Sequence, residues 1–580
     1  IDLLKCNVHS KTSEFIENCF AQGFLQLVTK PTRCYHRTAT LIDHFYTNSK
    51  QNNLTCGILT SRLSDHFPLC TFIPHKKKKI IPKTLRVRSF NSESTKKFRE
   101  VLENISWEDI KRSDDAQLGY DLFSMKFNEL FDLYFPEKTV KFNKNIHSLE
   151  PYITSGILVS RKNKLKLERK SIKSPTDINK QLYKDYKNKY NTVIRSAKKI
   201  YYEETLEKNK GDLRKTWQIL KEAIGKNSHN YMNISEMEKD GIRIKESEEI
   251  ANYLNEHFTT IAGKIAEKIN PTDRPPDIEI DMNEDDHIFV FSLFTTENLI
   301  DMVKKMENKN SRDLDGLSNN FLKQIICEIA EPLTHVLNLS LKTGVIPQQL
   351  KRAKVVPIFK LNKSANNEHL NPLFYRPISL LPIFSKILEK KVADSLVKYL
   401  DDFNLIYQHQ YGYRKKYSTY HPMIHLMNKV TSALNNGDIA IGVFCDLQKA
   451  FDTCKHSILI SKLKKYKIFN AELKWFENYL DNREQQVTVD NKLSEKKVNS
   501  TGVPQGSILG PILFLIYIND LPNVTSLLML LFADDCSLLI TGKTLHEIIP
   551  KLNDELHKMC TWFRAHELAL HPEKTKFMIF

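Results

Sequence analysis

The 580-residue sequence contains no apolar run long enough to cross a membrane. Its most apolar stretch, ILGPILFLIYI at 508–518, has eleven residues and is interrupted by Gly510 and Pro511, whereas a transmembrane helix needs about 20. The first residues, IDLLKCNVHS, also lack the charged segment and apolar core of a secretory signal. We therefore expect no membrane partner, and we interpret the start at Ile1 as a cut through a longer protein.

The ten cysteines include no C-x-x-C pair and no Cys/His cluster with zinc spacing. They are scattered from Cys6 to Cys560, which is typical of reduced thiols in an intracellular protein and excludes a disulfide framework or a zinc module. A hydrophobic content of 41% is enough to form buried cores, and the length suggests about three or four domains.

Acidic residues are in the minority, and the basic excess is concentrated in one segment. The chain has 86 Lys and Arg against 69 Asp and Glu, a net charge of +17, and residues 161–210 alone hold sixteen basic and six acidic residues. This favours a polyanionic partner, with a solvated basic helix as the alternative. Two roles are open for the tyrosines at 183, 186, 190, 201 and 202: stacking on bases, or packing one helix against another.

Patterning divides the chain into four parts. Residues 1–75 alternate short apolar runs with turn residues, and residues 76–150 begin with the linker KKKKIIPK and continue as helices. Residues 151–290 are a basic helical connector that ends in the proline-containing loop NPTDRPPDIEID. In residues 291–580, strand-like segments such as KVVPIFK and QQVTVD alternate with helical ones, which is typical of a mixed α/β domain.

The segment LLMLLFADDCSLLI at 527–540 places Asp534 and Asp535 between two apolar runs. The runs predict buried strands over 527–532 and 536–540, joined by a tight turn. Two carboxylates at such a turn repel one another, and burying them is costly unless a cation compensates. A turn that points its acids at water is the alternative, but the apolar flanks favour a site for Mg²⁺ or Mn²⁺.

A second carboxylate is available at the end of another predicted strand. Residues 439–444 are apolar, and Asp446 follows them. One acid alone holds a hydrated divalent ion poorly, so we expect Asp446 and Asp534 to meet on neighbouring strands. Two carboxylates that hold two ions suit nucleotidyl transfer, in which the ions activate the attacking hydroxyl and stabilise the phosphoryl group that is displaced.

Between the two acids, STGVPQGSILGP at 500–511 predicts a bent backbone that can approach a substrate closely.

Three segments in this order, VFCDLQKAFDT, GVPQGSILGPILFLIYINDLP and LFADDCSLL, resemble the palm motifs of reverse transcriptases, in particular those of jockey-like non-LTR retrotransposons. Upstream, VVPIFK, NPLFYRPISLLPIFSKILEK and QYGYRKKYST resemble the fingers of the same family, and LALHPEKTKFMIF resembles its late palm. The resemblance covers about 290–580. It implies a right-hand polymerase with fingers and an antiparallel palm sheet, and the thumb expected after the palm is missing.

The resemblance implies roles for the residues around the predicted metal site. Asp446, Asp534 and Asp535 would be catalytic residues and ligands of Mg²⁺ or Mn²⁺. Lys574 would lie near the departing pyrophosphate as a proton donor.

The resemblance also implies a set of substrate contacts. Phe451, five residues after the first acid, would stack under the deoxyribose and exclude a 2′-hydroxyl by size. Gln505 and Gly506 would contact the incoming nucleotide or its template partner. Lys360 and Arg376 would neutralise the triphosphate.

Near the N-terminus, KPTRCYHRTATLIDHFYTN and LSDHFPL resemble the C-terminal end of an apurinic-type endonuclease domain, an α/β sandwich of the endonuclease/exonuclease/phosphatase type. His66 would be the catalytic imidazole, Asp43 its orienting carboxylate and Asp65 a neighbouring acid. In that family the metal-binding Glu and the catalytic Tyr precede a stretch like IDLLK. We therefore expect a truncated domain that is poorly ordered on its own and has lost its nuclease activity.

Together these features predict an RNA-directed DNA polymerase that copies the RNA of a non-LTR retrotransposon at a primed target. Its partners would be an RNA template, a DNA primer and dNTPs, in the nucleus during synthesis and in a cytoplasmic ribonucleoprotein before it. One alternative is a polymerase that makes RNA, against which Phe451 argues. Another is a catalytically silent RNA-binding remnant, against which the intact Asp446, Asp534 and Asp535 argue.

Overall fold

The computed structural model describes residues 1–35, 38–48, 54–60, 64–72, 84–141, 150–224, 234–269, 288–360 and 368–580. The predicted linker at 76–83 and the predicted loop at 270–281 lie outside these residues. The chain divides into two compact units, one of Ile1–Leu85 with Val140–His229 and one of Arg86–Thr139 with Asn230–Phe580. Within the described residues, no helix is long and apolar enough to span a membrane.

The described part of residues 1–72 is a small α/β arrangement. Its helix α1 (Ser10–Ala21) accompanies three two-stranded antiparallel sheets, β1 (Leu25–Gln26) with β4 (Tyr46–Thr47), β2 (Arg33–Tyr35) with β3 (Thr38–Thr40), and β5 (Thr55–Ile58) with β6 (Leu69–Phe72). Leu3, Val28 and Leu41 form its buried core. Asp2 fixes the first residues to this core, because its carboxylate accepts a 2.8 Å hydrogen bond from the Leu41 N–H.

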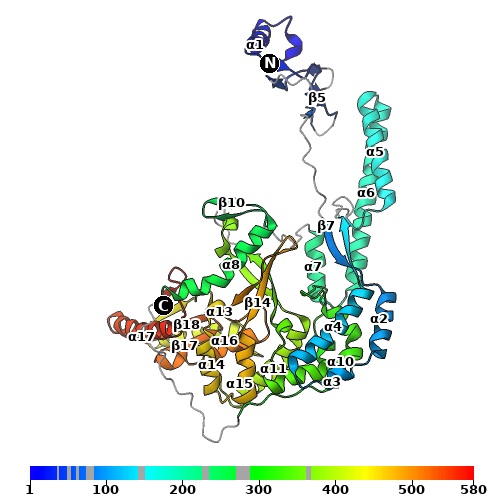
Figure 1. Cartoon of the computed structure of the whole chain (residues 1–580). Helices are drawn as coiled ribbons and strands as arrows, with labels where there is room; N and C mark the ends of the chain where they lie inside the picture. Colours follow the sequence, from blue (N-terminus) through cyan, green and yellow to red (C-terminus); the bar gives the residue numbers. More distant parts are fainter. Residues whose placement is uncertain are drawn as a thin grey trace. The chain divides into compact units, whose positions relative to one another are not determined.

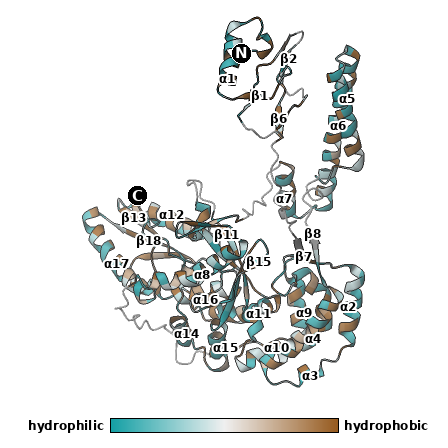
Figure 2. Ribbon diagram, turned by 45° about the horizontal axis from the view of Figure 1, so that its top comes forward, coloured by the Kyte–Doolittle hydropathy of each residue, from teal (hydrophilic) through white to brown (hydrophobic). Residues whose placement is uncertain are grey.

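The basic segment folds as a hairpin of two long helices, α5 (Ser155–Lys173) and α6 (Asp177–Lys208), followed by α7 (Leu213–Ala223). Figure 2 shows that α5 and α6 are largely hydrophilic, and α6 has no buried residue. The Tyr183 hydroxyl donates a 2.8 Å hydrogen bond to Glu168 of α5, and Lys164 of α5 lies 5.2 Å from the Tyr190 ring. These tyrosines therefore pack one helix against the other, which answers the question left open by the sequence for these two positions.

An aromatic core joins several helices of the second unit. They are α2 (Ser92–Asn104), α3 (Glu108–Lys111), α4 (Ala116–Tyr134), α9 (Thr296–Lys305) and α10 (Asn319–Thr343). The strand β7 (Thr84–Arg88) precedes α2, and β8 (Glu137–Lys141) follows α4. Phe123, Phe127 and Phe131 recur every four residues on α4, so they share one face and are fully buried. Their rings stack, with centroids 5.8 and 5.9 Å apart.

Two sheets carry the rest of this unit (Figure 1). The first runs β12 (Tyr375–Leu380), β11 (Ala353–Phe359), β14 (Arg483–Val489), β15 (Lys492–Leu493), with β16 (Lys497–Asn499) also paired to β14. The helix α8 (Ser247–Ala266), which follows the hairpin β9 (Met237–Lys239) and β10 (Ile242–Ile244), packs on this sheet. The second sheet is antiparallel throughout and runs β17 (Leu528–Phe532), β18 (Asp535–Gly542), β13 (Ile439–Cys445), β19 (Lys576–Ile579).

The structure confirms the mixed α/β class and the strands predicted over 439–444, 527–532 and 536–540. It also confirms strands at KVVPIFK and QQVTVD, which are β11 and β14. The remaining helices of the unit are α11 (Ile383–Asp402), α12 (Tyr420–Asn435), α13 (Ala450–Thr453), α14 (His456–Lys465), α15 (Asn470–Leu480), α16 (Leu509–Ile518) and α17 (Leu545–Ala565). The limits of the four parts drawn from the sequence remain predictions.

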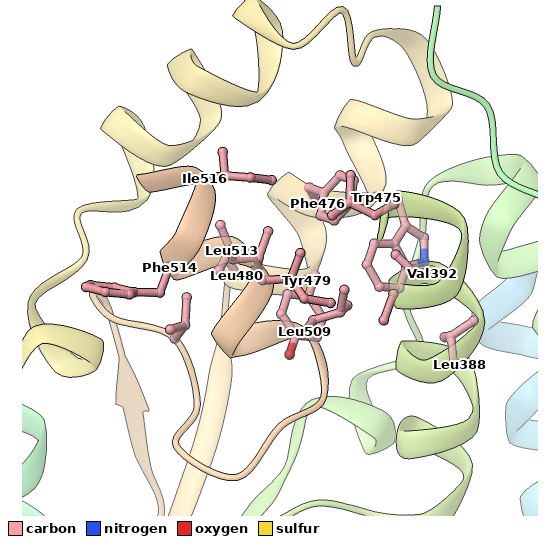
Figure 3. Close-up of a cluster of buried hydrophobic side chains, with 14 of the residues drawn as sticks. Leu388, Val392, Trp475, Phe476, Tyr479, Leu480, Leu509, Leu513, Phe514 and Ile516 are labelled. Carbon is pink, nitrogen blue, oxygen red and sulfur yellow. The ribbon is translucent and has the colours of Figure 1, made fainter. Parts of the chain in front are cut away.

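The apolar stretch that is too short for a membrane is a helix buried on all sides. In Figure 3, side chains of α16 such as Leu509 and Leu513 lie against Tyr479 of α15, with Leu388 and Val392 of α11 in the same cluster. A helix surrounded by protein needs no polar face, which explains why this segment is uniformly apolar. It forms the rigid base from which the loop at 500–508 extends.

A buried lysine connects α14, α16 and α17. The Lys462 ammonium donates to the Tyr517 carbonyl and, at 2.6 Å, to Asp520, and it lies 4.8 Å from the Trp562 ring. Burial lowers the pKa of Lys462 to about 8. The His566 ring stacks on Trp562 at 3.8 Å. The ion pair with Asp520 therefore compensates a charge that is costly to bury.

We expect Lys462→Ala to destabilise the second unit by about 3–5 kcal/mol, because it leaves Asp520 buried without its partner. Lys464→Ala, on the exposed face of the same helix, is the matched control and should change stability by less than about 0.5 kcal/mol. Thermal and denaturant unfolding midpoints measure both. Equal midpoints for the two variants would contradict the compensating role of the pair.

Candidate active site

Three carboxylates meet at one end of the antiparallel sheet. Strand β13 pairs with β18 in a register that aligns Cys445 with Cys536, so Asp446 emerges beside the turn that carries Asp534 and Asp535. Burial raises the pKa of Asp534, and the like charges of Asp535 and Asp446 raise it further. Partial burial and the charge of Asp446 also raise the pKa of Asp535. The sequence predicts that Asp446 and Asp534 meet on neighbouring strands, and the structure places them in this way.

The turn between β17 and β18 is held by a segment far upstream in the chain. The buried Gln410 side chain accepts hydrogen bonds from the Gly412 N–H at 2.9 Å and the Ala533 N–H at 3.0 Å. A Cβ on Gly412 would lie 2.2 Å from the Ala533 nitrogen, so only glycine allows this approach. Ala533 itself has a φ of 58°, a left-handed conformation that non-glycine residues rarely adopt. The position of Asp534 therefore depends on the QYG segment.

Asp446 is fixed from the opposite side by the chain before β19. Its carbonyl accepts a 2.8 Å hydrogen bond from the His571 N–H, and its carboxylate forms a 2.7 Å ion pair with the exposed Lys574. The sequence places Lys574 near a departing pyrophosphate, and the structure puts it directly on the first acid.

A group of cations faces the carboxylates from the first sheet. Lys360 and Arg376 lie at the end of the β11–β12 ladder, where Ile358 pairs with Arg376. Burial lowers the pKa of Lys360 to about 8, and the positive charges of Lys449, Arg376 and Lys574 add to this effect. Burial also lowers the pKa of Lys449. Neighbouring cations that repel one another have the charge that a polyanion would complement.

Lys449 is a member of this group to which the sequence assigned no role. It adopts a left-handed conformation, φ 49° and ψ 41°, before α13. Its ammonium lies 3.5 Å from the Tyr375 carbonyl of β12. The one feature of the sequence that could have indicated a role for Lys449 is its position three residues after Asp446, in the turn that follows the strand.

Phe451 lies between the carboxylates and the glycine-rich loop. Its half-buried ring stacks on Phe514 of α16 with centroids 4.8 Å apart, and Tyr413 meets it edge-on at 6.1 Å. Burial raises the pKa of Tyr413, and the nearby charge of Asp534 adds to this. The Phe514 contact gives Phe451 a rigid support.

Backbone contacts hold the glycine-rich loop between α13 and β12. A Cβ on Gly502 would lie 2.6 Å from the Asp452 carbonyl oxygen, and one on Gly506 would lie 2.7 Å from the Ser379 carbonyl oxygen. Both glycines have positive φ angles, 80° and 112°. The Gln505 side chain, which the sequence predicts to face the nucleotide, donates a 2.9 Å hydrogen bond to Asp452.

Glu389 of α11 anchors the far end of this loop. One oxygen of the fully buried carboxylate accepts a 2.7 Å hydrogen bond from the Ile508 N–H before α16, and the other accepts a 2.8 Å hydrogen bond from the Tyr479 hydroxyl. A carboxylate at a helix N-terminus is favourable because the first N–H groups lack partners inside the helix. Neither Glu389 nor Asp452 was singled out from the sequence.

The three carboxylates suit a hard divalent cation whose remaining ligands come from a substrate. Among the described residues, no three His, Cys, Asp or Glu side chains are grouped closely enough to hold an ion by themselves. Mg²⁺ is commonly bound through one or two carboxylates and completed by phosphate oxygens and water. The mutual repulsion of Asp446, Asp534 and Asp535 fits a site that is completed in this way.

In the first unit the residues predicted for an endonuclease also lie together. The His66 Nδ1 is 2.9 Å from an Asp43 carboxylate oxygen, and Asp65 pairs with Arg33 at 2.7 Å. Burial opposes ionisation of Asp43, yet hydrogen bonds from Thr32 and His66 hold its pKa below the usual value. Asp43 is thus the acid that contacts the imidazole, whereas the carboxylate of Asp65 is held by Arg33.

A family model described as "Reverse transcriptase (RNA-dependent DNA polymerase)" matches residues 366–579. These residues include all of the second sheet and the glycine-rich loop, and they exclude Lys360. The match therefore covers the carboxylates, Phe451 and Gln505.

Three Drosophila proteins are similar to the chain. "Probable RNA-directed DNA polymerase from transposon BS" of Drosophila melanogaster is 26% identical over 441 residues, which are 73% of this chain and 48% of the relative. "RNA-directed DNA polymerase from mobile element jockey" of the same species is 24% identical over 566 residues, 91% of this chain and 58% of the relative. The jockey protein of Drosophila funebris is 28% identical over 295 residues, 49% of this chain and 32% of the relative. The chain spans about half the length of the first two relatives.

Proposed function

We propose that this chain, whose residues 366–579 are a reverse transcriptase domain of the non-LTR retrotransposon type, copies an RNA template into DNA from a DNA primer. The observation that carries the proposal is the meeting of Asp446, Asp534 and Asp535 at one sheet end, opposite the cations Lys360 and Lys449. A nucleoside triphosphate and a divalent cation bring the opposite charges that these two groups need. The second sheet and its helices would be the palm, and the β11–β12 sheet the fingers.

Each group of the site has a distinct role in this proposal. Lys360, Arg376 and Lys449 bind the triphosphate, and Arg376 can contact two oxygens at once. Phe451, supported by Phe514, lies under the sugar and leaves no room for a 2′-hydroxyl. Lys574, which pairs with Asp446 at 2.7 Å, would donate a proton to the leaving pyrophosphate.

Asp446 and Asp534, with Asp535 beside them, would hold Mg²⁺ or Mn²⁺. When bound, such ions lower the pKa of an attacking hydroxyl and stabilise the charge of a displaced phosphoryl group. The residues of the chain contribute the fixed oxygen ligands and the sheet that holds them in register.

We propose that the α5–α6 hairpin binds RNA through its phosphates, without regard to sequence. Basic side chains are exposed on both helices, while Tyr183 and Tyr190 are engaged between them. Bases would therefore find few free aromatic faces, and charge would provide most of the affinity.

The first unit supports a second, separate proposal, that residues 1–72 derive from an apurinic-type endonuclease domain. A histidine that a carboxylate orients, as Asp43 orients His66 at 2.9 Å, is the arrangement of a general acid or base. Asp65, paired with Arg33, would be the neighbouring acid.

We expect Asp534→Asn to reduce dNTP incorporation on a primed RNA template by at least about 1,000-fold, because it removes a ligand charge worth several kcal/mol. The fold should remain intact or become slightly more stable, since the like-charge repulsion that raises the Asp534 pKa disappears. Asp554→Asn, at an exposed position of α17, is the control and should retain full activity. Comparable activity in a folded Asp534→Asn protein would rule out the metal-ligand role.

We expect Phe451→Ala to lower the preference for dNTPs over rNTPs by about tenfold or more, because the space below the sugar opens. Single-nucleotide incorporation with matched dNTP and rNTP measures the ratio. Phe469→Ala, which shortens a partly exposed ring on α15's N-terminal side, should leave the ratio unchanged. If Phe451→Ala also leaves it unchanged, sugar selection lies elsewhere.

For the hairpin we expect RNA affinity to fall steeply with salt. The variant replaces four exposed lysines of the hairpin by Glu: Lys162, Lys166, Lys184 and Lys189. Each lost phosphate contact with a single strand lowers the slope of log affinity against log salt by roughly 0.7, so the variant should lower the slope by about three. The control replaces four exposed lysines on other helices, Lys96, Lys304, Lys342 and Lys551. Equal slopes for the two variants would mean that the hairpin's charge is only a solvated surface.

A further inference from the structure

The carboxylate of Asp452 has one hydrogen bond and one buried oxygen without a partner. Its Oδ1 accepts the 2.9 Å hydrogen bond from the Gln505 Nε2. Its Oδ2 is buried, and none of the described residues hydrogen-bonds to it. Asp452 and Gln505 line a small cavity of about 40 Å³ with His456, Arg483 and Gln485. A buried carboxylate with so few partners is costly to keep, which points to the one hydrogen bond that it does make, with Gln505.

Backbone hydrogen bonds leave the side chains of Asp452 and Gln505 little freedom to separate. The Val503 N–H donates to the Phe451 carbonyl at 2.8 Å, and the Gly502 N–H donates to the Cys454 carbonyl at 2.8 Å. On the other side of the loop, the Gln505 carbonyl accepts a 2.8 Å hydrogen bond from the Ser379 N–H. The loop is thus tied to the α13 segment and to β12 at once.

An amide side chain has two chemically different ends, and an ionised carboxylate accepts hydrogen bonds only. Facing Asp452, the Gln505 amide must therefore turn its NH₂ group toward the carboxylate. Its Oε1 then remains available, and within the described residues no group donates a hydrogen bond to it. With a neutral partner, either end of the amide could face inward.

We propose that Asp452 is a positioning residue of the polymerase site, whose carboxylate fixes the Gln505 amide so that the carbonyl oxygen, and not the amino group, is presented to the nucleotide. The inference rests on the proposed function. It specifies the chemistry of the contact: the group that Gln505 recognises on the nucleotide is a hydrogen-bond donor, such as a hydroxyl or an amino group.

Charge near Asp452 supports an ionised carboxylate in the complete site. Burial raises the pKa of Asp452 to about 6, and Lys449, the Gln505 amide and Lys360 oppose this rise. The remaining titratable neighbours in the surrounding cavity are His456 of α14 and Arg483 of β14. At neutral pH the carboxylate is therefore the acceptor that the inference requires.

The test exchanges the carboxylate and the amide between positions 452 and 505. Asp452→Asn should raise the KM for dNTP by about tenfold with a smaller change in kcat, because the amide orientation is no longer fixed. Gln505→Glu should impair incorporation further, because two carboxylates then face one another. In the double variant D452N/Q505E, the amide introduced at position 452 can donate to the carboxylate introduced at position 505. The second oxygen of that carboxylate remains as the acceptor for the nucleotide, so the double variant should recover at least about tenfold in kcat/KM over Gln505→Glu.

The controls separate positioning from packing and from the proposed function itself. Asp402→Asn, at an exposed position at the end of α11, should behave as wild type, and unfolding midpoints should show that all variants are folded. An unchanged KM in Asp452→Asn, or losses in the double variant that merely add, would overturn the inference while leaving the proposed function in place. A wild-type chain that incorporates no dNTP would overturn both. If Gln505→Glu does not fold, Gln505→Ala replaces it, and Asp452→Asn should then have no further effect in that background.

Discussion

The register between β13 and β18 is the constraint on which the site depends. It aligns Cys445 with Cys536, and so places Asp446 beside Asp534 and Asp535. A shift of one residue would turn every side chain of a strand to the opposite face of the sheet. The two faces of these strands pack into different apolar clusters, with Ile441 and Val443 in one and Ala440 and Leu539 in the other, so a shift would exchange the side chains of two cores. Packing at a distance from the chemistry thus determines where the carboxylates lie.

Two groups of like charges face each other across the site, and within each group the charges repel one another. The pKa of Asp534 is raised by burial and by neighbouring acids, while that of Lys360 is lowered to about 8 by burial and by neighbouring cations. Such opposed shifts are typical of functional sites, because a structure that needed only stability would pair or remove these charges. A triphosphate with a divalent cation carries the complement of both groups. In the proposed function, binding of such a substrate would relieve the repulsion within both groups.

Sequence patterning was sufficient for features that are local. Apolar runs identified the strands next to Asp446 and Asp534. The apolar stretch at 508–518 was recognised only as too short for a membrane, and that it is the buried helix α16 needed the structure. Contacts between distant segments could not be anticipated: Glu389 meets the Ile508 N–H across 119 residues, and Gln505 meets Asp452 across 53. The tyrosines of the basic hairpin show the same limit, because only the position of α5 decides whether Tyr183 and Tyr190 face a helix or a base.

The most direct test of the central claim is primer extension on a defined RNA template by the wild-type chain, with each dNTP supplied alone in the presence of Mg²⁺. The account predicts that only the dNTP complementary to the next template base is added, that the matching rNTP is not, and that removal of Mg²⁺ with a chelator stops the reaction. Addition without regard to the template, equal use of rNTP and dNTP, or no addition by a folded chain would contradict the account.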